Sequence, residues 1–280
     1  MKSNKPVELS IDGNGVATIL LNRPDIHNAF DDLMISELTE MLYKIDKNTN
    51  IRLVLLKGAG KSFSAGADLN WMKRMAHYNW NENFQDSLAL ASLLSALHGL
   101  TQPIIAVVQG SAYGGGVGLI AACDFAIASN KAKFCLSEVK LGLIPAVISP
   151  YVVRAMGERA SKRYFISAET FDAYKAFELG LVSEVVPHSD LDTVVENMVQ
   201  QIIANGPIAI AEAKKLIDKV SLGDINEEMI RDTAQKIADL RSSPEGKEGV
   251  SAFLEKRRPV WPDKESIVTD LAEVSDDELE

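Results

Sequence analysis

Hydrophobic positions in the first half of the chain predict strands that alternate with helices. Strands are indicated by alternating or uninterrupted apolar runs, over residues 7–11, 15–21, 52–58, 104–109, 124–129 and 133–137. Apolar residues recur at helical spacing over 31–47. A longer helical pattern over 70–98 is expected to break near 78–83, where polar and aromatic residues cluster. Repeated strand–strand–helix units of this kind predict a wound α/β core.

After residue 149 the pattern is almost entirely helical. Helices are predicted over residues 150–156, 158–167, 172–179, 190–204, 207–219, 226–240 and 245–257, and one short strand over 182–186. We therefore expect an α/β core (1–200), a C-terminal helical region (201–261) and an acidic tail (262–280). Apolar residues of the tail follow helical spacing, so it forms either a short helix or a disordered segment.

The charge of the chain is distributed unevenly. The 280 residues carry a net charge of −10, which argues against a general nucleic-acid binder and against anchoring on an anionic membrane. The tail alone holds eight acids and one lysine, so the remaining body is nearly balanced. The case against nucleic acid therefore rests on the 31–47 helix, which carries five acids against two lysines.

Several classes of protein are not supported by the sequence. No apolar segment follows the N-terminal lysines as in a signal peptide, and no run approaches the ~18 apolar residues of a membrane-spanning helix. Cys123 and Cys135 lie in apolar stretches, so we expect buried free thiols and a cytoplasmic protein. The four histidines show no metal-ligand spacing, so we expect no metal.

Two glycine-rich loops, 58–68 and 110–118, each follow a buried strand and lead into a helix. A helix N-terminus offers unpaired N–H groups and partial positive charge, so two such ends could bind one oxygen anion. The alternative is that both loops are tight turns that pack a helix on a strand. Neither loop has the pattern of a P-loop or of a dinucleotide-binding fold.

Glu138 differs from most acids of the chain because its surroundings in the sequence are apolar. A carboxyl group in such a setting tends to have a raised pKa and can transfer protons near neutral pH. The alternative is a structural ion pair with a nearby lysine or arginine.

Four motifs together resemble the crotonase (enoyl-CoA hydratase/isomerase) superfamily over residues 7–258. They are LNRPDIHNAF (21–30), SFSAGADLN (62–70), PIIAVVQGSAYGGGVGLIAACDFAIAS (103–129) and FCLSEVKLGLIP (134–145). The resemblance implies an α/β fold, a crotonase-like spiral of ββα units with a C-terminal helical trimerisation region. It also implies a homo-oligomer (a trimer or a dimer of trimers), an acyl-CoA substrate and no separate cofactor, because CoA belongs to the substrate.

The resemblance also assigns roles by motif position. The catalytic residues would be Glu138, as acid and base, with Ala67 and Gly115, whose N–H groups would hold the oxygen of an enolate. The substrate and CoA would be bound by Arg23, Ile26, Asn28, Ala65, Ala67, Asp68, Leu69, Asn70, Gly115, Phe253 and Lys256. Two of these have alternatives from the residues alone: Asp68 as a helix cap, and Lys256 as a surface lysine.

The sequence departs from the full hydratase pattern at Gly118, where that pattern has a second glutamate. A single acid suits a Δ3,Δ2-enoyl-CoA isomerase. It also suits hydration, provided that Glu138 serves both steps or another group orients the water. Residues 137–165 resemble the bacterial methylglutaconyl-CoA and carboxygeranoyl-CoA hydratase branch, whose substrates carry a branched β-carbon and a distal carboxylate.

We therefore predict an enoyl-CoA hydratase that adds water across C2=C3 of a branched, 3-methylglutaconyl-CoA-like thioester. The alternatives are the isomerase, a non-catalytic acyl-CoA-binding protein and an RNA-binding relative.

Overall fold

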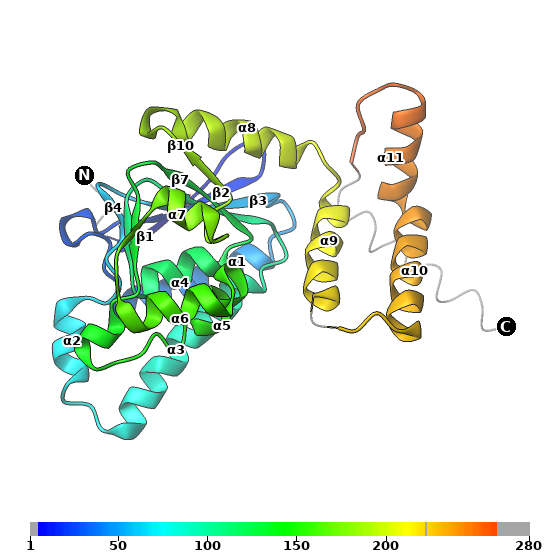
Figure 1. The fold of residues 1–280 in the computed structure, drawn as a ribbon. Coiled ribbons are helices and arrows are strands. Elements are labelled where there is room, and N and C mark those ends of the chain that lie inside the picture. Colours follow the sequence, from blue (N-terminus) through cyan, green and yellow to red (C-terminus); the bar gives the residue numbers. More distant parts are fainter. Residues whose placement is uncertain (1–4, 222, 262–280) are drawn as a thin grey trace. The chain divides into compact units, whose positions relative to one another are not determined.

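The computed structural model describes residues 5–221 and 223–261, so the predicted tail helix lies outside the described residues. The chain divides into two compact units (Figure 1). Within the described residues, the first comprises 5–100 and 104–199, and the second comprises 101–103, 200–221 and 223–261. Each unit is described separately below.

The first unit contains a six-stranded sheet of order β1-β2-β3-β5-β7-β10. Its strands are β1 (Val7–Ile11), β2 (Val16–Leu21), β3 (Leu53–Gly58), β5 (Ile104–Val108), β7 (Phe125–Ser129) and β10 (Glu184–Val186). The predicted hairpin is confirmed, since β1 pairs antiparallel with β2. The other neighbouring strands are parallel. Their apolar runs are buried, as expected for parallel strands that are covered on both faces.

A second sheet has the order β4-β6-β8-β9. It comprises β4 (Ser62–Ser64), β6 (Ser111–Tyr113), β8 (Lys133–Cys135) and β9 (Phe171–Asp172). The prediction of glycine-rich loops over 58–68 and 110–118 is wrong for part of each range, because each contains a short strand. Such strands are too short to show a period of two, and their backbone pairing comes from other segments of the chain.

Helices surround the strands of this unit, and Figure 1 shows α2–α6 together along one side of them. Their bounds are α1 (Asp32–Asp46), α2 (Leu69–Met75), α3 (Trp80–His98), α4 (Gly115–Ala122), α5 (Ser149–Met156), α6 (Glu158–Ser167) and α7 (Ala173–Glu178). Three short 3₁₀ helices accompany them, η1 (Pro24–Ile26), η2 (Glu138–Leu141) and η3 (His188–Asp190). Helix α8 (Leu191–Ile203) extends past the boundary of the unit at Val199.

The predicted break in the 70–98 helix is confirmed, between Met75 and Trp80. Asn79 ends the break as a helix cap. Its side chain accepts a hydrogen bond from the backbone N–H of Glu82, and the Glu82 side chain accepts one from the N–H of Asn79. This reciprocal cap satisfies two otherwise unpaired donors, which explains why α3 starts anew rather than continuing α2.

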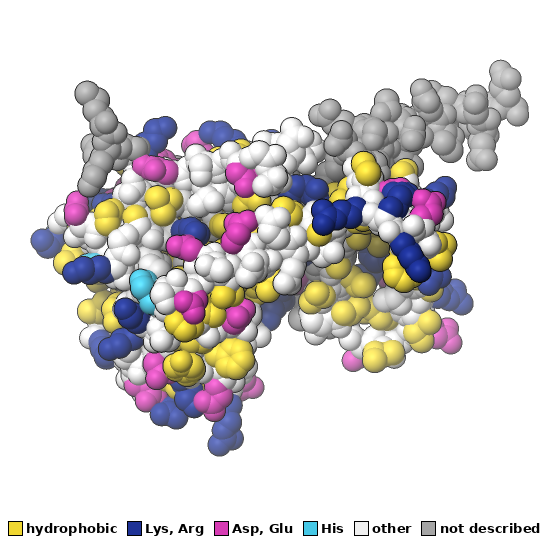
Figure 2. Space-filling view, turned by 90° about the horizontal axis from the view of Figure 1, so that it is seen from above, with side chains coloured by type: hydrophobic (Ala, Val, Ile, Leu, Met, Phe, Trp, Pro, Cys, Tyr) yellow, Lys and Arg dark blue, Asp and Glu magenta, His cyan; other side chains and the backbone are white. Residues whose placement is uncertain are grey.

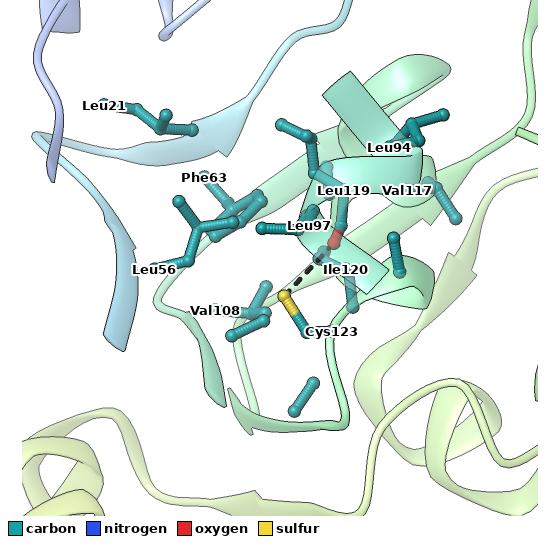
Figure 3. Packing of buried hydrophobic residues seen from close by; sticks show 14 of the residues in the cluster. Leu21, Leu56, Phe63, Leu94, Leu97, Val108, Val117, Leu119, Ile120 and Cys123 are labelled. Atoms are coloured by element: carbon teal, nitrogen blue, oxygen red, sulfur yellow. Dashed lines mark hydrogen bonds between the residues drawn. The ribbon is translucent and has the colours of Figure 1, made fainter. Parts of the chain in front are cut away.

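The core lies between the large sheet and the helices. Figure 3 shows side chains of β3, β5, α3 and α4 converging around Cys123. Its thiol donates a hydrogen bond to the carbonyl oxygen of Leu119, at 3.2 Å. Cys123 and Cys135 are both buried and free, which confirms their predicted place in the core.

The second unit is helical, with α9 (Pro207–Val220), α10 (Glu227–Ser242) and α11 (Pro244–Leu254). The carboxylate of the buried Glu245, at the start of α11, accepts hydrogen bonds from the N–H groups of Ile208 and Ala209 at the start of α9. A carboxylate at a helix N-terminus is stabilised by the unpaired N–H groups there, so this contact joins the two helices.

Candidate active site

Three residues predicted to be catalytic follow the carboxyl ends of three adjacent strands. Strands β4, β6 and β8 are parallel neighbours, and Ala67, Gly115 and Glu138 come just after them in turn. Carboxyl ends of neighbouring parallel strands share one edge of a sheet, where α/β proteins commonly bind ligands. The small sheet that the sequence did not predict therefore brings these residues together.

A cavity of about 440 Å³ lies at this edge and is lined by all three residues. Its other lining residues are Phe30, Trp71, Met75, Asn83, Asp86, Ser87, Leu90, Gly142, Leu143, Ile144, Pro145, Ala146, Val147 and Ile148. All of them belong to the first unit. The volume is within the range of small-molecule sites, and the lining is mainly apolar with a few polar groups.

The N–H groups of Ala67 and Gly115 are available to a ligand. A local parallel bridge uses the N–H of Phe30, which donates to Gly66 O, and the N–H of Asp68, which donates to Phe30 O, both at 2.9 Å. Within the described residues, neither Ala67 N–H nor Gly115 N–H donates a hydrogen bond. Gly115 is also the first residue of α4, so its N–H belongs to the positive end of a helix.

The glycines of the second loop are required by its geometry. Gly114 has φ of +50° and ψ of −121°, a conformation that L side chains rarely adopt. A Cβ at Gly115 would lie 2.3 Å from Cζ of Phe30, well inside van der Waals contact. The loop can therefore present the Gly115 N–H against the Phe30 ring only without a side chain.

Glu138 begins the 3₁₀ helix η2, with its carboxyl beside Gly114. Its Oε2 atom is buried and has no hydrogen-bond partner among the described residues. Burial raises the pKa of this carboxyl, and a hydrogen bond from its own backbone N–H offsets part of the increase. No ion pair to Glu138 is present in the described part of the chain, so the alternative of a structural salt bridge is wrong.

Arg23, predicted to bind CoA, holds the loops of the site together. One of its guanidinium nitrogens lies 2.9 Å from Asp31 Oδ2 and donates to Ala29 O, and the other lies 3.4 Å from Asp68 Oδ2. Asp68 also caps α2, as the residue-based alternative predicted, by accepting from the N–H groups of Asn70 (2.7 Å) and Trp71 (3.1 Å). Both charged groups thus support the segment that carries Ala67.

Asn28 has a similar supporting place. It is fully buried, and its amide donates to the carbonyl oxygens of Ala59 and Ser62, both at 2.8 Å, and accepts from Arg23 N–H at 2.9 Å. The side chain is therefore fully engaged by the backbone of the first glycine-rich loop. Its backbone is engaged as well, since the Asn28 N–H donates to Arg23 O and the Ser64 hydroxyl donates to Asn28 O, both at 2.9 Å. A contact of Asn28 with CoA stays a prediction.

The remaining predicted CoA contacts lie outside the cavity lining. Ile26, Leu69 and Asn70 are exposed, whereas Ala65 is half-buried and donates its N–H to His27 O. Phe253 and Lys256 belong to the helical unit, where Phe253 is 82 % exposed. Their contacts with CoA stay predictions.

The space beside Gly118 is filled by the aliphatic side chain of Ile148. A Cβ at Gly118, in α4, would lie 2.1 Å from Cγ2 and 2.7 Å from Cβ of Ile148, the residue before α5. The described structure therefore has no space for a carboxylate at this position. The proximity of these residues is a tertiary feature that the motif alone did not indicate.

Sequence reasoning also missed the polar face that α3 presents to the cavity. Asn83, Asp86, Ser87 and Leu90 recur at helical spacing and line one wall. On a helix, polar residues at such positions ordinarily indicate a solvated face, and no local signal distinguishes the two cases.

The comparisons identify the family. The model of the enoyl-CoA hydratase/isomerase family matches residues 12–264. The chain belongs to this family, within the crotonase superfamily. A short-chain-enoyl-CoA hydratase of Clostridium acetobutylicum is 31 % identical over 245 residues, which cover 87 % of this chain and 92 % of that protein.

Solved structures show the same fold. An enoyl-CoA hydratase from Shewanella pealeana is 46 % identical with a TM-score of 0.88, covering 92 % of this chain and 96 % of the other. One from Mycobacterium smegmatis is 33 % identical with a TM-score of 0.87, covering 92 % and 99 %. The predicted fold, an α/β crotonase fold with a parallel sheet and a C-terminal helical region, is confirmed.

Neither a metal site nor a membrane-spanning helix is found among the described residues. No group of three or more His, Cys, Asp or Glu side chains there could hold a metal ion. Over the same ranges, no helix combines the length and apolar character needed to cross a membrane.

Proposed function

We propose that the protein is an enoyl-CoA hydratase that adds water across C2=C3 of an enoyl-CoA thioester. The observation that carries the proposal is the meeting of two unused backbone donors, Ala67 N–H and Gly115 N–H, with the unpaired carboxyl of Glu138 in one cavity. Family membership supports an acyl-CoA substrate. Among the described residues, no group of three or more His, Cys, Asp or Glu side chains could hold a metal ion. Addition of water to this bond needs no further cofactor.

In the proposed reaction, the thioester oxygen binds between the two N–H groups. When water attacks C3, the π electrons of C2=C3 move toward the thioester and negative charge develops on that oxygen. Loss of one such donor typically costs about 3–4 kcal/mol of transition-state stabilisation. Glu138 then delivers a proton to C2, a role that suits a carboxyl whose pKa is raised by burial.

For the acyl group we propose a branched chain of the 3-methylglutaconyl-CoA type. The resemblance of residues 137–165 to that hydratase branch supports the proposal, and the apolar wall of residues 142–148 offers contacts for a methyl branch. No Lys, Arg or His is among the described lining residues, so a distal carboxylate would have to bind neutral donors such as the Ser87 hydroxyl. A comparison of 3-methyl-2-enoyl-CoA substrates with and without a terminal carboxylate tests this point.

A second function, Δ3,Δ2-enoyl-CoA isomerisation, is favoured by the aliphatic contact at Gly118 and Ile148, which excludes the second glutamate of the full hydratase pattern. Proton transfer from C4 to C2 requires one acid–base group, and Glu138 could serve it. Absorbance of the conjugated enoyl thioester distinguishes the two: a hydratase removes it from a 2-enoyl-CoA, whereas an isomerase creates it from a 3-enoyl-CoA.

The variant that tests both functions is Glu138→Gln. We expect its turnover to fall by about 100-fold or more, the usual contribution of a positioned acid–base group. Glu40→Gln, at an exposed position of α1, is the matched control and should keep wild-type turnover. Full activity of Glu138→Gln would contradict both functions, and absence of turnover by the wild type on any enoyl-CoA would favour the acyl-CoA-binding alternative.

We further propose the homo-oligomer that the resemblance implies, a trimer or a dimer of trimers, in which Phe253 and Lys256 bind the CoA of a neighbouring subunit. Light scattering measures the assembly, and Lys256→Ala should raise KM for acyl-CoA without lowering kcat. Binding of RNA is not proposed. A gel-shift assay at physiological salt would detect it.

A further inference from the structure

We propose that Asp86 is the second acid–base residue of the hydration reaction, in place of the glutamate that position 118 lacks. This inference rests on the hydratase function proposed above. Asp86 would activate the attacking water. It belongs to α3, which lies outside the four motifs that resemble the crotonase superfamily.

Position 118, which carries a second glutamate in the full hydratase pattern, is blocked in this protein. Ile148 occupies the space into which a side chain at Gly118 would extend, so that wall can neither hold a carboxylate nor hydrogen-bond a water molecule through one. If water is activated by a side chain, the group must come from elsewhere in the cavity lining.

Two carboxyl groups line the cavity. Among the described residues that line the cavity, Asp86 and Glu138 are the two with ionisable side chains. They come from different elements, since Glu138 begins η2 after β8 and Asp86 lies in the middle of α3. Two carboxyl groups from separate elements can act on separate atoms of the reaction, here on the water that attacks C3 and on C2.

Asp86 is held in position by Trp71. The indole N–H of Trp71 donates to Asp86 Oδ1 at 3.1 Å, and Trp71 itself is only 3 % exposed. The indole ring packs on Phe30, with ring centroids 6.2 Å apart, and the Phe30 ring lies against Gly115. The same aromatic pair therefore supports the Gly115 donor and fixes one oxygen of Asp86. For the other oxygen, Oδ2, no partner is present among the described residues.

The electrostatics of Asp86 suit a base. Burial raises its pKa, as does the charge of Asp32, while the Trp71 hydrogen bond and Arg74 lower it. Arg74 is itself ion-paired with Asp32, so Asp86 is not neutralised by a direct cation. A carboxylate with a raised pKa accepts a proton more readily than an ordinary one.

In the proposed step, the Asp86 carboxylate accepts a proton from water while the water oxygen bonds to C3. The π electrons of C2=C3 form a double bond between C2 and the thioester carbon, and the π electrons of the thioester C=O move onto its oxygen, which gives the enolate. The enolate collapses, and C2 takes the proton of the Glu138 carboxyl. Transfer of a proton from Asp86 to Glu138 through water restores both groups, so one water molecule is consumed in each turnover.

Two reactions of the same enzyme test the assignment. Hydration of a 2-enoyl-CoA needs both carboxyl groups, whereas exchange of the C2 hydrogen of a saturated acyl-CoA in D₂O needs only Glu138 and the two N–H donors. Asp86→Asn keeps an oxygen for the Trp71 indole but cannot accept a proton. We expect its kcat for hydration to fall by about 100-fold or more, with C2 exchange within about threefold of wild type. Asp86→Glu, which restores a carboxyl, should recover part of the hydration rate.

Glu40→Gln is the matched control, because it removes a charge from an exposed position of α1 without changing the cavity lining or the ion pair of Arg74 with Asp32. It should hydrate at close to the wild-type rate. Wild-type hydration by Asp86→Asn, an effect on KM alone, or equal loss of hydration and exchange would each overturn the assignment while leaving the proposed function intact. Failure of the wild type to hydrate any enoyl-CoA would instead overturn the proposed function.

Discussion

Single residues of the cavity depart from their usual environments. The carboxyl of Glu138 is half-buried, and in the described structure its Oε2 atom has no partner. An ionised carboxyl in such a place loses more hydration than the hydrogen bond from its own backbone N–H replaces, so the folded protein holds the proton more tightly than the unfolded chain does. A group useful for proton transfer therefore lowers stability when it is charged.

This loss predicts a pH-dependent stability difference for Glu138→Gln. Below the ordinary glutamate pKa the carboxyl is neutral in both folded and unfolded states, and the variant should unfold at about the wild-type temperature. As the pH rises through the raised folded pKa, the wild type must ionise a partly buried group and loses stability that the variant keeps. Thermal unfolding at about pH 4 and about pH 8 measures the difference. A wild type that gains stability relative to the variant at the higher pH would contradict the raised pKa.

Packing between elements decides which residue types the site accepts. Helix α4 approaches the start of α5 so closely that the Ile148 side chain fills the space that a side chain at Gly118 would need. Interiors are close-packed, so an added methyl group there has to displace a neighbour. The departure from the full hydratase pattern is thus tied to a helix–helix contact rather than confined to one position.

We expect Gly118→Ala to destabilise the fold by about 1–3 kcal/mol, the typical cost of overpacking. Ile148→Ala removes the obstructing atoms, so the double variant should be more stable than the sum of the two single effects predicts. Urea unfolding of all four proteins measures this coupling. Gly13→Ala is the control, because a Cβ there meets nothing within 4 Å, and its effect should stay within about 0.5 kcal/mol. Strict additivity of the two single effects would mean that a side chain at position 118 and that of Ile148 do not compete for the same space.

At the scale of the whole molecule, most of the net negative charge lies in a different part of the sequence from the residues that line the cavity. Figure 2 shows side chains of both signs interspersed over one face, with hydrophobic side chains between them. Most of the net charge of −10 belongs to residues 262–280 in the sequence. All described lining residues of the cavity fall between Phe30 and Ile148. The acidity of the chain therefore has little bearing on the local chemistry of the cavity.

Truncation after Trp261 tests this separation. Removal of the acidic tail should leave kcat within about twofold of wild type, since no described lining residue is lost, while raising the isoelectric point through loss of seven net negative charges. Steady-state kinetics and isoelectric focusing measure the two effects. A large loss of kcat would mean that the tail contributes to the reaction.

From the sequence alone follow the strands of the large sheet, most helices, the break before Trp80, the positions of the two glycine-rich segments and the apolar neighbours of Glu138 along the chain, because these depend on local periodicity, caps and backbone conformation. The tertiary structure alone decided that β4, β6 and β8 pair, that Ile148 fills the space beside Gly118, and that Trp71 holds Asp86 at the cavity. These contacts join residues that are far apart in the chain. Their energies depend on shape and burial in three dimensions, which no local pattern of hydrophobic and polar residues encodes.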